Sequence, residues 1–116
     1  MIEKIGVGID IINVSRFRNM PFEKKSSFYK KIFHDNEINY CLKFKDPYTH
    51  FAGKFALKEA LIKSIDKKIF PSEIETSYLN SKPIINISKN TKDYRFIASL
   101  SHENEFAIAV ILSVKN

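Results

Sequence analysis

The chain has one cysteine, no tryptophan, three glycines and four prolines among its 116 residues. A single cysteine cannot form an intrachain disulfide or complete a CxxC metal or redox site, so we expect a protein of a reducing compartment, the cytoplasm. We expect Cys41 to be a small, half-buried residue on the apolar side of a short helix. The scarcity of glycine and proline excludes collagenous and low-complexity proteins.

Long apolar runs are also missing. The longest uninterrupted run, residues 106–112, is far shorter than the ~20 residues that a membrane-spanning helix needs. A run near the N-terminus, residues 5–9, is cut by Asp10, and it has neither a strong basic cluster before it nor a small-residue cleavage site after it. We therefore expect no signal peptide and no membrane partner.

Apolar and aromatic residues are plentiful. Hydrophobic residues make up 44% of the chain, and ten phenylalanines and five tyrosines supply large side chains for a core. A chain of this length can bury roughly two thirds of the surface that its unfolded form exposes. We expect one globular domain over residues 1–116.

Positive charge dominates. Nineteen Lys and Arg residues against thirteen Asp and Glu residues give a net charge of +6, which favours an acidic partner. Nucleic acid, an anionic membrane, a phosphate-rich small molecule and an acidic protein all fit this charge, and so does a lysine-rich surface that only keeps the protein soluble. Composition does not choose among these classes.

Hydrophobic periodicity predicts strands on both sides of a helical middle section. Alternation with a period of two predicts a first strand over residues 5–12, and Asp46 followed by Pro47 predicts the start of the longest helix. The predicted helices cover residues 21–32, 37–42 and 47–65, and the later strands cover residues 73–79, 83–87, 95–100 and 106–114, with a turn at 80–82. This order predicts an α+β fold with helices packed on one face of a mostly antiparallel sheet.

Two carboxylates stand out. Asp10 lies inside the first strand on the same face as Gly6 and Gly8, where it needs a cationic partner unless it only caps the following turn. The longest helix carries a stripe of small residues that also contains Glu59 and Lys63. If this stripe packs on the glycines, Asp10 and Glu59 can converge on a hard cation such as Mg²⁺, which takes one or two protein carboxylates. The simpler alternative is an exposed ion pair between Glu59 and Lys63.

Three lysines, Lys54, Lys58 and Lys63, lie within three turns of the longest helix. Such a group forms either a solvated face or a phosphate cradle made of side chains. The second interpretation is chemically relevant because the chain has no GxxxxGK[ST] loop that would bind phosphate through its backbone.

One histidine lies in a polar setting. His102 follows Ser99, Leu100 and Ser101 in a segment predicted to connect two strands. There it could bind phosphate or act as an acid or base, or simply be exposed. His34 and His50 lack the spacing of a zinc site, so we expect none.

Taken together, these segments resemble the holo-[acyl-carrier-protein] synthases, the small single-domain 4′-phosphopantetheinyl transferases. The matching segments, which span nearly the whole chain, are 6–11 with Arg16, 32–33 with Glu37 and 40–41, 51–63, and 99–102 with Ala107 and Ala109. The resemblance implies the fold of that family. It also implies Mg²⁺-dependent transfer of phosphopantetheine from coenzyme A to a serine of apo acyl carrier protein, with release of adenosine 3′,5′-bisphosphate.

The resemblance further implies roles for single residues. Asp10 and Glu59 match the metal ligands, and Lys63 matches the lysine that contacts the coenzyme's pyrophosphate. Lys54 falls where the family has an arginine near the 3′-phosphorylated ribose, and His102 matches a histidine on the phosphate side of the coenzyme. Two candidates stay open for the general base that takes the serine proton: Glu59 and a metal-bound water.

Partners follow from the same resemblance. Arg16 falls where the family has an arginine that reaches the acidic recognition helix of the carrier protein. Family members are typically homotrimers with the coenzyme between subunits, and Asn80, Ser81, Lys82 and Pro83 would supply part of the adenine and ribose wall across the interface. The chain departs from the family pattern at Ser81 and Asp66, which replace glycines, and at Lys54, which lacks the planar fork of arginine.

The alternative is a small basic nucleic-acid-binding domain without catalysis, which the same net charge and aromatic content would suit. No RNP-type strand, GxxG loop, zinc finger or basic helix-turn-helix pattern occurs, and the aromatic residues fall at core spacing. We therefore expect no nucleic-acid partner.

Overall fold

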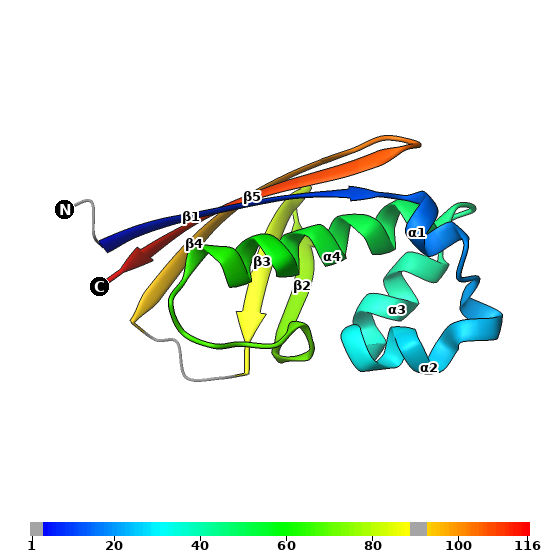
Figure 1. Ribbon diagram of the computed structural model, residues 1–116, viewed down its shortest axis with the longest axis horizontal. Coiled ribbons are helices and arrows are strands. Elements are labelled where there is room, and N and C mark those ends of the chain that lie inside the picture. Colours follow the sequence, from blue (N-terminus) through cyan, green and yellow to red (C-terminus); the bar gives the residue numbers. More distant parts are fainter. Residues whose placement is uncertain (1–3, 89–92) are drawn as a thin grey trace.

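The structure is a computed structural model, and it describes residues 4–88 and 93–116. Its elements are, in chain order, β1 (Ile5–Asn13), α1 (Ser15–Arg18), α2 (Phe22–Ile32), α3 (Asp35–Leu42), α4 (Pro47–Ser64), the 3₁₀ turn η2 (Pro71–Glu73), β2 (Ile74–Leu79), β3 (Lys82–Ile87), β4 (Tyr94–His102) and β5 (Phe106–Lys115). Helix α4 runs along the long strands, while α1, α2 and α3 gather at one end of the molecule (Figure 1).

The strands pair in two antiparallel sheets. β1, β5 and β4 form one sheet in that order, and β2 and β3 form a separate hairpin. The predicted α+β class, with antiparallel strands and helices packed against them, is confirmed. The later strands do not continue one ladder, because the β2–β3 hairpin packs against α4 and β4 without joining the sheet.

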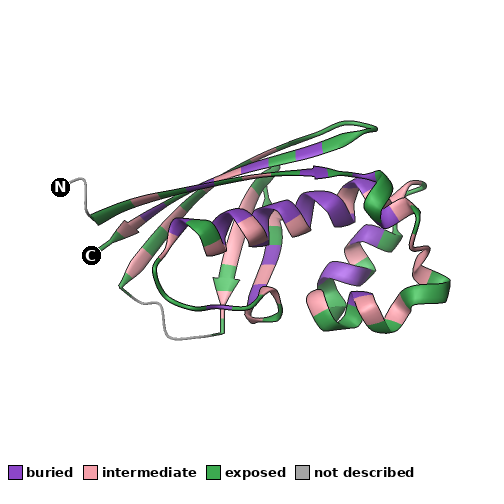
Figure 2. Ribbon diagram, in the orientation of Figure 1, coloured by how far each residue is buried: buried purple, intermediate pink, exposed green. Residues whose placement is uncertain are grey.

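Helix α4 is the centre of the core. It begins as predicted, with Pro47 in the first turn and the Asp46 carboxylate accepting the backbone N–H of Tyr48 at 3.2 Å. Buried residues follow one another along its length, so the helix is covered on nearly all sides (Figure 2). In the described part of the chain no helix is both long and apolar enough to cross a membrane.

Three local expectations need correction. Helix α1 was not predicted, because its four residues are too few to show a helical period. Strand β4 extends to His102, since pairing with β5 continues through His102 and Ala107; the Ser99–His102 segment therefore belongs to the strand. Cys41 is fully buried rather than half-buried, and burial raises the pKa of its thiol to about 12.

The face of the large sheet that points away from α4 is apolar and open. Alternate residues of β1 and the matching residues of β5 and β4 lie on it. Their side chains are between 37% and 63% exposed: Ile5, Val7, Ile9, Ile11, Ile97, Phe106, Ile108 and Leu112. Contiguous apolar surface of this kind usually marks an interaction site.

Candidate active site

Strand β1 crosses helix α4 at backbone contact. A Cβ atom added to Gly8 would overlap the carbonyl oxygen of Ala60, and one added to Gly6 would overlap that of Ser64. Only glycine leaves room for so close an approach. The predicted packing of the glycine face on the small-residue stripe is confirmed, and it brings the next inward-facing residue of β1, Asp10, to α4.

Asp10 has the cationic partner that its position requires. Its side chain is 12% exposed, and its Oδ1 accepts a hydrogen bond from Lys63 Nζ at 3.0 Å. The same ammonium donates to the carbonyl oxygen of Ile9 at 3.2 Å. Within the described part of the chain, the ion pair of Lys63 is with Asp10 across the strand–helix contact, not with Glu59 on its own helix.

Glu59 lies one turn before Lys63 on α4, and the charge of Asp10 acts on it. Burial, followed by the negative charge of Asp10, raises the pKa of Glu59, while the positive charges of Lys63 and Arg16 act in the opposite direction. The structure thus places the two carboxylates in one electrostatic field. The negative charge of Asp10 disfavours ionisation of Glu59, and an added positive charge nearby would favour it.

The acid pair fits a hard divalent cation. Asp10 Oδ2 is buried and has no hydrogen-bond partner among the described residues. A buried carboxylate oxygen normally has a partner, and a metal ion could serve as one here. Residues 4–88 and 93–116 contain no group of three or more His, Cys, Asp or Glu side chains placed to hold a metal. In proteins Mg²⁺ is usually held by one or two carboxylates, and water or substrate oxygens complete its coordination.

Arg16 of α1 lies on the same side of the helix as the acid pair. It is exposed, its guanidinium lies 5.7 Å from the centre of the Phe55 ring, and its charge acts on Glu59. Arg16 therefore acts on Glu59 of the acid pair and is also exposed to solvent. A residue that binds a partner protein must be exposed in this way.

A second group of candidate residues surrounds His102. Its ring packs edge-on against that of His50, with centroids 5.1 Å apart. Burial, and then the charge of His102, lowers the pKa of His50. The two histidines share a cavity of about 220 Å³ with Tyr40, Tyr78, Ser81, Pro83 and Leu100. Sequence reasoning missed His50; its place one turn before Lys54 on the longest helix was the available signal.

The turn between β2 and β3 forms one rim of this cavity. Asn80 and Ser81 have φ angles of 52° and 67°, in the left-handed region. Asparagine tolerates that region, whereas serine takes on a cost on the order of 1 kcal/mol there. Lys82 begins β3 in solvent, and Pro83 pairs with Tyr78 in the hairpin. The predicted turn is confirmed at Asn80 and Ser81, whereas Lys82 belongs to β3 because it is paired with the last residue of β2.

Sheet register relates the two groups. Asp10 and Leu100 both lie opposite Ala109 of β5, so all three side chains point to the α4 face. His102 is two residues beyond Leu100 and points the same way. Asp10 and His102 therefore lie on one face of the sheet, on strands that are two strand spacings or ~10 Å apart.

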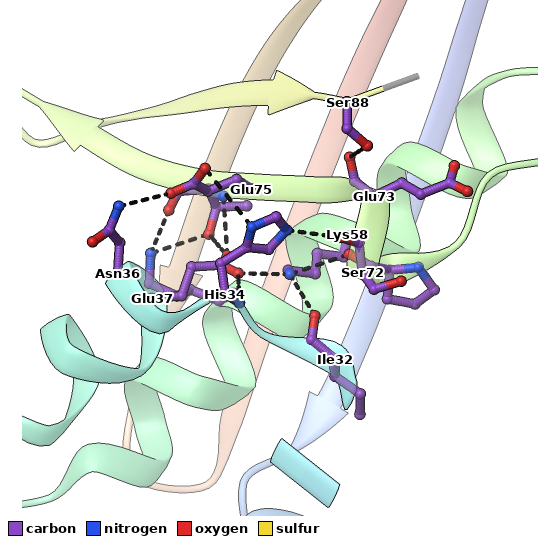
Figure 3. Close-up of polar contacts among 12 residues, drawn as sticks. Ile32, His34, Asn36, Glu37, Lys58, Ser72, Glu73, Glu75 and Ser88 are labelled. Carbon is purple, nitrogen blue, oxygen red and sulfur yellow. Dashed lines mark hydrogen bonds and ion pairs between the residues drawn. The ribbon is translucent and has the colours of Figure 1, made fainter. Parts of the chain in front are cut away.

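The three lysines of α4 do not form one face. Lys58 is fully buried, and its ammonium donates to Glu37 Oε1 at 2.7 Å and to the carbonyl oxygens of Ile32 and Pro71 at 2.8 and 3.2 Å (Figure 3). Lys54 is 1% exposed, and only Lys63 reaches solvent. The solvated-face interpretation is wrong for Lys54 and Lys58. The protein's own acceptors occupy Lys58, so it is not available for a phosphate cradle.

Glu37 is the centre of this buried network, and sequence reasoning did not find its role. Its Oε1 also accepts the backbone N–H of His34 at 2.9 Å, while its Oε2 accepts the backbone N–H and hydroxyl of Thr76 at 3.0 and 2.7 Å. His34 is the N-cap of α3, which makes Glu37 the third helical residue. A glutamate at that position, reaching back to the cap, was the missed signal.

Comparison with known proteins identifies the family. The model of the 4′-phosphopantetheinyl transferase superfamily matches residues 6–111. The chain belongs to that superfamily. A holo-[acyl-carrier-protein] synthase of Halothermothrix orenii is 39% identical over 119 aligned positions, which cover 92% of this chain and 94% of the relative. Within the superfamily, the chain is a member of the holo-[acyl-carrier-protein] synthases and is a transferase.

Solved structures of holo-[acyl-carrier-protein] synthases have the same fold. One from Bacillus anthracis, in complex with coenzyme A (3′,5′-ADP), is 30% identical with a TM-score of 0.81 and covers 96% of each chain. One from Helicobacter pylori, in complex with coenzyme A, is 34% identical with a TM-score of 0.77 and covers 95% of this chain and 99% of that one. The reaction of this holo-[acyl-carrier-protein] synthase is therefore phosphopantetheinyl transfer.

Proposed function

We propose that this protein catalyses Mg²⁺-dependent transfer of 4′-phosphopantetheine from coenzyme A to a serine of apo acyl carrier protein. The serine oxygen forms a new bond to the phosphorus that carries pantetheine. The pyrophosphate P–O bond breaks, adenosine 3′,5′-bisphosphate leaves, and the serine proton passes to a base, either Glu59 or a water. One observation carries the proposal: Asp10, which is paired with Lys63 and acts electrostatically on Glu59, has its Oδ2 buried and unpartnered among the described residues.

Asp10 and Glu59 would hold the magnesium ion. When bound, Mg²⁺ supplies positive charge to the pyrophosphate as the bisphosphate leaves. The Lys63 ammonium would add a second positive charge beside the same pyrophosphate. Its side chain is 57% exposed, so its ammonium can contact a phosphate oxygen while its stem remains packed on the helix.

The cavity beside His102 is the proposed site for the adenosine end of the coenzyme. Tyr40, Tyr78, His50 and His102 present ring faces and edges that suit a flat base. His102 and the exposed Lys82 can supply donors to phosphate, and Ser81 and Pro83 would complete the wall.

We further propose a homotrimer with coenzyme sites between neighbouring subunits. The open apolar face of β1, β5 and β4 supports self-association, because a monomer would leave that face in water. Sedimentation velocity at micromolar concentration should give the mass of three chains. A monomer at that concentration would contradict this part of the proposal.

The carrier protein would dock beside the acid pair, at Arg16. Its acidic recognition helix complements the exposed guanidinium and the net charge of +6, and such steering weakens as salt rises. Coenzyme A and carrier proteins are cytoplasmic, which is where we expect the protein to act.

The nucleic-acid alternative is not favoured. Phe17, Tyr29, Phe33 and Phe51 pack against one another with centroid distances of 4.6 to 6.2 Å, and each is at most 3% exposed. Rings in the core cannot stack on bases.

Incubation with coenzyme A, Mg²⁺ and an apo carrier protein tests the function. Mass spectrometry should find one phosphopantetheine added to the carrier, and a chelator should prevent it. Asp10→Ala and Glu59→Ala should abolish transfer with the far-ultraviolet circular dichroism unchanged, whereas Asp93→Ala, at an exposed aspartate, should not. An unmodified carrier, together with salt-dependent binding of RNA or DNA, would favour the alternative. Full activity of Glu59→Ala in chelator would refute the metal assignment.

A further inference from the structure

Lys54 is a buried cation held between two aromatic rings. Its ammonium lies 4.8 Å from the centre of the Tyr40 ring, which comes from α3, and 4.8 Å from that of Tyr78, which comes from β2. The two rings are 5.3 Å apart and inclined by 32°. Cation–π attraction is strongest where water is excluded, and Lys54 is only 1% exposed.

The position of the ammonium is fixed independently of the rings. It donates to the carbonyl oxygen of Thr76 at 2.9 Å and to the Thr76 hydroxyl oxygen at 3.0 Å. That hydroxyl donates onward to Glu37 Oε2 at 2.7 Å, and Glu37 is paired with Lys58. The network thereby ties Lys54 of α4 to Thr76 of β2 and, through Glu37, to α3.

The two tyrosines line two cavities. One is the cavity of about 220 Å³ that His50 and His102 also line. The other has a volume of about 500 Å³ and is lined by Lys54 as well. The Tyr40 ring packs edge-on against the His50 ring, with centroids 6.0 Å apart, and the His50 ring packs edge-on against the His102 ring, with centroids 5.1 Å apart. A shift of the tyrosines would therefore reach the histidines through direct ring contacts.

We propose that Lys54 is a positioning residue, whose ammonium holds Tyr40 and Tyr78 in place as the wall of the coenzyme cavity without itself contacting the ligand. The inference rests on the proposed function, which places the adenosine end of the coenzyme in that cavity. It differs from the role that the resemblance implied for this position, a direct contact near the 3′-phosphorylated ribose. The buried ammonium already has two hydrogen-bond acceptors and two rings around it.

Lys54→Met separates the two roles when it is assayed with coenzyme A and with 3′-dephospho-coenzyme A. Methionine keeps the length and apolar stem of lysine and removes the charge. A positioning role predicts that KM rises about tenfold for both coenzymes, equivalent to about 1.4 kcal/mol, with kcat changed less than about twofold. Tyr78→Leu should raise KM similarly, and the double variant should lose much less than the product of the two losses.

The control is Lys115→Met, which removes an exposed lysine 5.9 Å from the Tyr94 ring and should leave KM unchanged. A loss confined to coenzyme A, with 3′-dephospho-coenzyme A unaffected, would overturn the proposal in favour of direct phosphate contact. Equal falls in kcat for all substrates, together with a lower Tm, would overturn it in favour of a general structural role. Failure of the proposed function looks different, because the unsubstituted protein would then modify no carrier with either coenzyme.

Discussion

The buried pair of Glu37 and Lys58 yields the sharpest stability prediction. Both side chains are 0% exposed, and they meet at 2.7 Å. Glu37→Gln keeps the shape of the side chain but leaves the Lys58 ammonium without its counter-charge. Breaking one partner of such a pair costs about 3–5 kcal/mol. Since domains of this kind have about 5–15 kcal/mol of stability in total, the variant should fold but be marginal.

The pH dependence of the same variant has a definite sign. Burial lowers the pKa of Lys58, and Glu37 is the main group that opposes this fall. Without Glu37, the pKa of Lys58 in the folded protein falls further below its value in the unfolded chain. The unfolded state then binds the proton more tightly, so the stability of Glu37→Gln should rise with pH between 7 and 9, by up to about 1.4 kcal/mol per pH unit.

Urea unfolding followed by circular dichroism measures both effects, provided that the m-value stays constant. Asp46→Asn is the matched control: the pair of Arg18 and Asp46 has a similar distance, 2.6 Å, but side chains that are 37% and 42% exposed. Asparagine preserves the cap of α4, so the loss there should be about 0–1 kcal/mol. A loss in Glu37→Gln no larger than in Asp46→Asn would refute the reasoning.

Three further predictions concern the site and its rim. Because the pKa of Glu59 is raised, its neutral form stabilises the fold at acid pH and this contribution is lost as pH rises through that pKa; Glu59→Gln without metal should raise Tm at pH 7 but not at pH 4. Arg16→Ala should raise KM for the carrier protein about tenfold, or by about 1.4 kcal/mol, with KM for coenzyme A unchanged in steady-state assays. Ser81→Gly should stabilise the protein by about 0.5–1 kcal/mol in urea, since glycine adopts the left-handed conformation freely; destabilisation would contradict this.

Much of the fold follows from local patterns. The capped start of α4 and the alternation of β1 predict those elements to within a residue or so. The end of β4 was missed because it depends on pairing with Ala107 and Ile108 of β5, which no local pattern contains. The close packing of β1 on α4 was predictable because glycines on one element and small residues on the other complement each other.

The buried lysines were not predictable in the same way. A lysine on a helix normally marks a solvent-exposed position, and a protein core tolerates lysine only when it is paired or fully hydrogen-bonded. The partner of Lys58 is Glu37, 21 residues away, and that of Lys54 is Thr76, 22 residues away. Their burial is thus a property of the tertiary structure, and it separates them from Lys63.

The seam between β1 and α4 restricts how this sequence can evolve. Gly8 precedes the metal-binding candidate Asp10 by two residues, and Ala60 directly follows Glu59. One extra methyl group at Gly8 would force the two main chains apart and would separate the carboxylates without altering either of them. Gly8 is therefore constrained by the absence of a Cβ atom, although its backbone carries no catalytic group. A comparison limited to the catalytic residues would overlook this position.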